Sequence, residues 1–106
     1  MQKVSVAIHG GAGTILKEDM TTSLEQAYRA ELQHALDVGF AVLEQGGTAI
    51  TAVKGAVIHL EDCELFNAGR GSVFTKKGLN ELDAAIMNGK NLEAGSVAAV
   101  RWAEGA

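Results

Sequence analysis

The sequence has 106 residues, a net charge of −4 and 47% hydrophobic residues, so it can build one small globular core and is too apolar for a disordered chain. It contains no basic cluster, which argues against nucleic acid or an anionic membrane as partner, and no apolar stretch approaches a membrane span. Its single cysteine, Cys63, cannot form a disulfide within the chain, and no signal-peptide pattern opens the sequence. We therefore expect a cytoplasmic protein.

The first predicted elements are a strand and a long helix. The apolar run at residues 4–8 predicts a buried strand that ends at the glycines of AIHGGAG, residues 7–13. Ser23, with Gln26 three residues later, matches a capping box that would begin the helix. Gly46 and Gly47 are typical of a left-handed cap that would end it. Its apolar stripe follows helical spacing: Leu24, Tyr28, Leu32, Ala35, Leu36, Gly39, Val42 and Leu43.

The remaining elements predict a second helix and an antiparallel sheet. Thr48 can cap the second helix, whose predicted inner face consists of Ala49, Val53, Val57 and Leu60. Residues 63–71 have no periodicity and predict an irregular loop. The pattern then indicates strands at 72–75, 79–87 and 95–102, with turns at 76–78 and 88–91. Because the helices and most strands are segregated along the chain, the predicted fold class is α+β.

The glycine-rich segment at residues 7–13 is compatible with several chemistries. Such a loop can cradle phosphate, but no Gly-Lys-Ser/Thr follows it. A His-Gly-Gly loop also forms the oxyanion hole of lipases, but the chain has no Gly-x-Ser-x-Gly elbow. Amino-acid kinases carry a similar turn, although no nucleotide site is evident here. A plain tight turn remains equally open.

Other candidate residues favour structural roles. His34 and His59 fall on different predicted helices with no second ligand at metal-binding spacing, so we expect packing or surface roles and no metal site. Thr14 and Thr48 each follow a glycine, as nucleophilic threonines do after self-cleavage. However, Thr14 adjoins the glycine loop and Thr48 suits a helix cap. Alternation places Asp83 on the face opposite its two neighbours, where it could orient another group or be solvated.

Several segments together resemble the plant-type asparaginases, or isoaspartyl peptidases, of the N-terminal nucleophile hydrolases. They are IHGGAG at 8–13, LEDCELFNAGRGSV at 60–73 and ELDAAIMNG at 81–89, and AGSVAAV at 94–100 also fits. The Phe-Asn-Ala-Gly-x-Gly core of the middle segment is more specific than the glycine loop alone. The resemblance covers nearly the whole chain.

The resemblance implies part of a four-layer α-β-β-α sandwich, made as a precursor and cut into α and β chains. Residues 1–106 would be a single incomplete domain, the N-terminal portion of the α chain. The N-terminal threonine of the β chain would attack L-asparagine or an isoaspartyl peptide and release aspartate through an acyl-enzyme. This sequence has no Gly-Thr-Val-Gly, so it would hold no catalytic residue and be inactive alone.

The implied partners are the β chain of the same precursor, further copies in a homo-oligomer, and a small-molecule or dipeptide substrate. The alternative is a non-catalytic folded remnant that acts by self-association or partner binding. Strand edges that lack their partners tend to associate, which favours self-association in either case.

The resemblance also assigns individual residues. His9, Gly10 and Gly11 match a loop behind the nucleophile, and Asn67 matches an asparagine near it that holds the catalytic loop. No cofactor is implied for catalysis, but a structural sodium ion is. Oxygen ligands suit such a hard cation. The implied ligands are the backbone carbonyls of Leu60, Glu61, Cys63, Phe66, Ala68 and Arg70.

Overall fold

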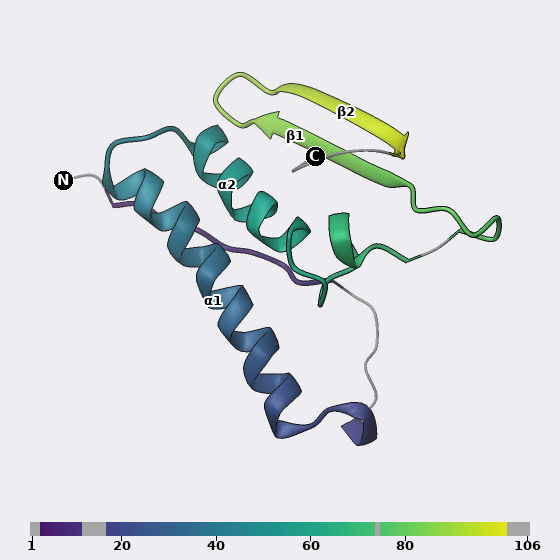
Figure 1. The fold of residues 1–106 in the computed structure, drawn as a ribbon. Helices are drawn as coiled ribbons and strands as arrows, with labels where there is room; N and C mark the ends of the chain where they lie inside the picture. The colour runs from purple at the N-terminus through teal and green to yellow at the C-terminus, as the bar shows by residue number, and fades with distance from the viewer. Residues whose placement is uncertain (1–2, 12–16, 74, 102–106) are drawn as a thin grey trace.

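The computed structural model describes residues 3–11, 17–73 and 75–101. Its elements are helices α1 (Thr22–Glu44) and α2 (Ala49–Glu61), strands β1 (Leu82–Asn88) and β2 (Glu93–Val100), and 3₁₀ turns at Lys17–Asp19 and Gly69–Gly71. Helix α2 lies between α1 and the antiparallel β1–β2 hairpin (Figure 1). The arrangement is α+β, as the sequence predicts. No helix within the described ranges is long and apolar enough to cross a membrane.

The predicted stripe of α1 is confirmed, but its predicted cap is wrong. Every residue of the stripe is buried or half-buried, with Ala35 and Gly39 the most enclosed. The N-cap is Thr21, whose hydroxyl accepts the N–H of Leu24 at 3.0 Å, and Ser23 already lies inside the helix. Residues 21–23 all carry hydroxyl groups, so each of these three neighbouring residues could serve as the N-cap. Thr21 takes the extended backbone that a cap requires.

The connection between the two helices follows the prediction. Gly46 has φ +82°, and its N–H donates to the carbonyl of Leu43, while the N–H of Gly47 donates to that of Val42. This pair of bonds is the Schellman arrangement, which satisfies carbonyls at the end of α1. The hydroxyl of Thr48 then accepts the N–H of Thr51 and caps α2.

The face of α2 that packs against α1 differs from the predicted one. Ala52 and Ala56 are 1% and 2% exposed, whereas Val53 and Val57 are 43% and 46% exposed. A Cβ atom added to Gly39 of α1 would lie only 3.3 Å from the carbonyl oxygen of Ala52, so small residues allow the helices to approach closely. Because α2 carries apolar residues on two sides, spacing alone could not identify the side that meets α1.

Two predicted strands do not form within the described residues. Residues 4–8 are extended, with Val4, Val6 and Ile8 half-buried, but they are not part of a sheet. The segment runs along the helix pair toward the loop after α2 (Figure 1), and Val6 lies against Gly39. Residues 72, 73 and 75 are also outside any strand, and residue 74 is not described. The turn that follows does form: the N–H of Gly78 donates to the carbonyl of Thr75.

The hairpin contains a β-bulge. Leu82 pairs with Val100 and Ala84 pairs with Val97, so Asp83 alone faces two residues of β2. One of them, Ala99, has φ +53°, and its N–H donates to Oδ1 of Asp83 at 2.8 Å. Asp83 is exposed while its two neighbours are half-buried, which confirms the predicted alternation.

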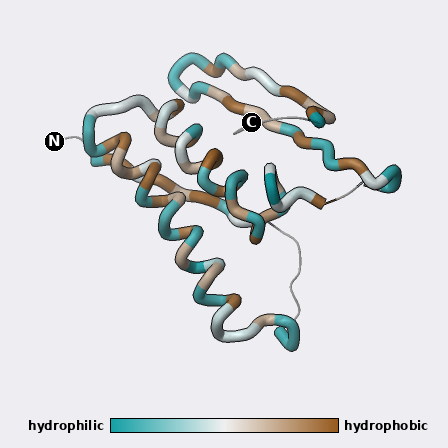
Figure 2. Tube along the Cα trace, in the orientation of Figure 1, coloured by the Kyte–Doolittle hydropathy of each residue, from teal (hydrophilic) through white to brown (hydrophobic). Residues whose placement is uncertain are grey.

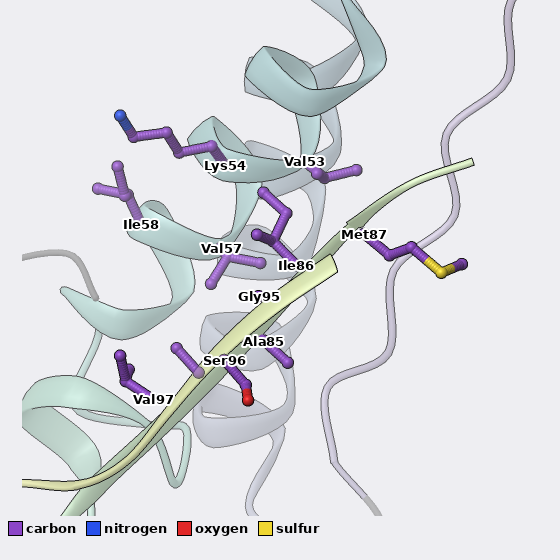
Figure 3. Close-up of a pocket in the computed structure, with 11 residues that line it drawn as sticks. Val53, Lys54, Val57, Ile58, Ala85, Ile86, Met87, Gly95, Ser96 and Val97 are labelled. Atoms are coloured by element: carbon purple, nitrogen blue, oxygen red, sulfur yellow. The ribbon is translucent and has the colours of Figure 1, made fainter. Parts of the chain in front are cut away.

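An open apolar groove of about 510 Å³ separates α2 from the hairpin. Figure 3 shows Val53 and Val57 of α2 beside Ile86 of β1 in this groove, with Val97 of β2 at one end. Apolar residues therefore follow the hairpin as well as the helices (Figure 2). The groove replaces the packed interior that a helix layer on a sheet would normally enclose.

Candidate functional site

The glycine-rich segment forms a turn that its own histidine stabilises. Nδ1 of His9 accepts the N–H of Gly11 at 3.0 Å, and Gly11 has φ +121°, a conformation that favours glycine. A Cβ atom on Gly10 would lie 3.2 Å from Leu32 and 3.3 Å from the ring of Phe66. The backbone of this turn therefore lies directly against α1 and the loop after α2. Thr14 falls outside the described residues.

The loop after α2 is held by an aromatic pair and by an amide. Phe66 is 6% exposed, and its ring meets Tyr28 of α1 edge-on, with centroids 5.6 Å apart. Oδ1 of the next residue, Asn67, accepts the N–H of Val73 at 2.9 Å and so bridges the loop from end to end. Because Gly10 touches Phe66, the segment 9–11 and the segment 66–67 are brought together, although they are far apart in sequence.

The backbone of residues 60–71 is folded tightly on itself. A Cβ atom on Gly69 would overlap the carbonyl oxygen of Glu61, and one on Gly71 would overlap that of Phe66. The carbonyls of Leu60, Phe66 and Ala68 accept N–H groups of Cys63, Ala68 and Gly71, respectively. Each carbonyl keeps a second lone pair, and carbonyl oxygens are the kind of ligand that a hard cation prefers.

The side chain of Glu61 is buried beside this loop. Glu61 is 6% exposed and stands at the last turn of α2, directly above the loop. Cys63 is half-buried, and Arg70 is exposed. The residue set implied by the sequence resemblance therefore lies in the last turn of α2 and the loop that follows it.

Other candidates lie elsewhere. Thr48 caps α2 at the end opposite the loop, and Asp83 lies in the hairpin bulge. The first helical residue after the glycines among the described ones is Lys17, in a 3₁₀ turn, and α1 begins only at Thr22.

Sequence reasoning missed a cluster of three polar side chains between the helices. Nε2 of His59 on α2 lies 2.7 Å from Oε2 of Glu31 on α1, and Nδ1 of His34 lies 3.8 Å from the other oxygen of Glu31. The structure thus brings both histidines to one carboxylate, although they lie on different helices as predicted. The Glu-x-x-His spacing of Glu31 and His34 indicates that these two side chains share one face of α1. The packing of α2 against α1 adds His59, which the sequence pattern does not indicate.

These features define an α+β chain whose candidate site is built from loops at one end of a helix pair. A family model described as asparaginase matches residues 1–105, and the chain belongs to this family. The family assignment agrees with the resemblance carried by the glycine turn and the Phe66–Asn67 loop.

Curated relatives from distant organisms support the assignment. The chain is 52% identical over 99 residues to an isoaspartyl peptidase/L-asparaginase of Xenopus laevis, covering 93% of this chain and 30% of the relative. It is 46% identical over 100 residues to an isoaspartyl peptidase of Salmonella typhimurium, covering 94% and 32%. A plant-type L-asparaginase of Pyrococcus horikoshii is 46% identical over 97 residues, covering 92% and 30%. The chain thus spans about three tenths of the length of these relatives.

Proposed function

We propose that this chain is the N-terminal part of the α chain of a threonine-dependent amidohydrolase that cleaves isoaspartyl peptides and L-asparagine. The observation that carries the proposal is the contact between the His9–Gly11 turn and the Phe66–Asn67 loop. These two segments carry the family resemblance, and they meet at one place in the fold. The nucleophilic threonine would come from a β chain of the same precursor, and the chain alone would be inactive.

In this proposal the residues of the chain position the site and do not react. The amine of the β-chain threonine would serve as general base for its own hydroxyl, which attacks the amide carbonyl, and water would then release aspartate from the acyl-enzyme. His9 holds the turn through its bond to the N–H of Gly11. Asn67 holds the loop through its bond to the N–H of Val73. Both bonds fix backbone that would lie beside the threonine.

A sodium ion is proposed for the loop after α2. Its ligands would be the backbone carbonyls of Leu60, Glu61, Cys63, Phe66, Ala68 and Arg70. The tight fold of this loop, in which Gly69 lies against the carbonyl of Glu61 and Gly71 against that of Phe66, supports a cation at this place. Such an ion would bind the carbonyl oxygens of the loop at 60–71 and so hold Asn67 in position.

A chimera tests the activity. Residues of the Salmonella relative that match this chain, about a third of it, are replaced by the chain, and hydrolysis of an isoaspartyl dipeptide and of L-asparagine is measured. We expect the chimera to hydrolyse one or both substrates and the 106-residue chain to hydrolyse neither. Asn67→Ala in the chimera should lower kcat, because it frees the loop beside the threonine. Gln33→Ala on the exposed side of α1 is the matched control and should leave kcat unchanged.

A soluble, folded chimera without activity would refute this proposal. It would favour the alternative of a non-catalytic folded remnant that acts by association. The exposed apolar side chains of the α2–hairpin groove support that alternative.

The sodium proposal predicts a cation-specific gain in stability. We expect the thermal midpoint of the chain to be higher in sodium chloride than in choline chloride at equal ionic strength, because an ion that binds only the folded state stabilises it. Equal midpoints in the two salts, measured by circular dichroism, would exclude a sodium site in this chain. A cytoplasmic location remains a prediction from the sequence composition, and homo-oligomer formation remains a prediction from the family resemblance.

A further inference from the structure

The cluster of Glu31, His34 and His59 lies between the middle of α1 and the last turn of α2. Glu31 and His34 are one turn apart on α1, so both side chains leave the helix on one side. His59 reaches the same point from the last turn of α2. The two imidazole rings meet edge-on, with centroids 5.7 Å apart, and Glu31 lies between their nitrogens.

The ligand atoms of the cluster lie close enough together to converge on one metal ion after small side-chain rotations. One nitrogen or oxygen from each residue can be chosen so that all three atoms lie within 4.8 Å of one another. Tetrahedral ligands at 2.0–2.1 Å from Zn²⁺ are about 3.3 Å apart. The separations of 2.7 and 3.8 Å from Glu31 to His59 and His34 lie on either side of that value. Small rotations of the side chains would therefore bring all three ligands to one ion.

The surroundings also suit a metal ion. Glu31 and His59 are about 30% exposed at their side chains and His34 is 59% exposed, so an ion can enter from solvent. Two ligands come from one rigid helix, and the third comes from a helix packed closely against it. Three protein ligands leave one position for water.

We propose that Glu31, His34 and His59 bind a divalent transition-metal ion, with Zn²⁺ as the reference ion, and that this ion ties α1 to α2. The donor set of two imidazoles and one carboxylate differs from the carbonyl loop after α2, which suits a hard cation. The site is independent of the proposed hydrolase activity, so its test does not depend on catalysis.

The test is a titration of the 106-residue chain with Zn²⁺ and, separately, with Co²⁺. We expect one ion per chain, a rise in the thermal midpoint, and visible Co²⁺ absorption bands of the intensity typical of four-coordinate sites. His34→Ala and His59→Ala should each weaken Zn²⁺ binding at least about tenfold, because loss of even an outer-shell partner costs this much. Glu31→Gln should weaken it as well, since the amide carries no charge.

Three control variants separate this site from others. Glu25→Gln changes an exposed carboxylate on the same helix, and His9→Ala removes the histidine outside the cluster. Cys63→Ser removes the thiol, which is the other strong Zn²⁺ ligand of the chain. All three should bind Zn²⁺ like the parent chain, and binding should be lost in urea, because only the helix packing assembles the cluster.

Two outcomes would overturn the proposal. One is Zn²⁺ binding that is unchanged in His34→Ala and His59→Ala, or that persists in urea. The other is no binding by the folded parent chain at Zn²⁺ concentrations well above that of the protein. Circular dichroism of each variant shows whether the helices remain intact, so a folding defect cannot be mistaken for the loss of a ligand.

Discussion

Gly71 is the residue at which a single methyl group should do the most damage. Its Cβ would overlap the carbonyl oxygen of Phe66 and lie 2.7 Å from that of Glu64, and neither backbone atom can move without opening the loop. We expect Gly71→Ala to lower the free energy of unfolding by about 1–3 kcal/mol, the usual cost of overpacking. Urea unfolding monitored by circular dichroism measures it.

The matched control is Gly89→Ala in the turn between the strands. No atom lies within 4 Å of a Cβ added there, so the free energy of unfolding should change by no more than about 0.5 kcal/mol. A similar decrease in the free energy of unfolding for Gly71→Ala and Gly89→Ala would contradict the tight contact between Gly71 and the carbonyl of Phe66.

Individual residues also show why sequence predicted the site only in part. Asn67 and the glycines were identified from their motif, and the structure adds what the motif cannot contain, the contact of Gly10 with Phe66. His34 and His59 were assigned separate roles because nothing in a linear pattern specifies which turns of two helices face each other. Helix packing decides that, and it depends on small residues such as Gly39.

At the scale of elements, the connection between the two helices was the best predicted feature, because its causes are local. The Gly46–Gly47 cap and the Thr48 cap rest on neighbouring residues alone. The inner face of α2 and the strand at 4–8 depend on partners distant in sequence, and there the predictions were wrong. The extended segment at 4–8 has the alternating burial of a strand without a neighbouring strand among the described residues.

The hairpin bulge should depend on Asp83. Its carboxylate accepts the N–H of Ala99, which the bulge removes from the ladder, and Ala99 keeps a left-handed φ of +53°. We expect Asp83→Ala to lower the free energy of unfolding by about 1 kcal/mol, the usual contribution of such a bond. Hydrogen exchange of the Ala99 amide should become faster.

Asp83→Asn keeps an oxygen acceptor and should retain most of the protection of the Ala99 amide. Unchanged exchange at Ala99 in Asp83→Ala would mean that the ladder, and not the carboxylate, holds the bulge.

The whole molecule exposes more surface than a compact protein of its size. Its accessible area is 8335 Å², whereas a folded monomer of 11.0 kDa exposes about 5,600 Å². Its radius of gyration is 15.3 Å, against about 13 Å for a compact chain of this length. The buried apolar side chains among the described residues are only Ala35, Ala52, Ala56 and Phe66. The chain therefore has the helix layer and part of a sheet, but little shared core.

We expect the isolated chain to self-associate through the α2–hairpin groove. Sedimentation velocity at increasing concentration should show species larger than a monomer, because exposed strand edges and apolar side chains favour pairing. Ile86→Lys, which places a charge in the groove, should shift the distribution toward monomer. Leu79→Lys, just after the turn at 76–78 and outside the groove, is the control and should not shift it. A folded parent chain that stays monomeric throughout would contradict this expectation.

The edge-on contact between Tyr28 and Phe66 has a practical consequence. The chain has only one tyrosine, and its ring meets the ring of the loop residue next to Asn67 at an angle of 83°. The ring current of one aromatic ring shifts the proton resonances of a neighbouring ring, and this shift changes steeply with the relative position of the two rings. The aromatic proton resonances of Tyr28 therefore report, from within helix α1, whether the Asn67 loop is in place when a cation, a β chain or a substrate is added.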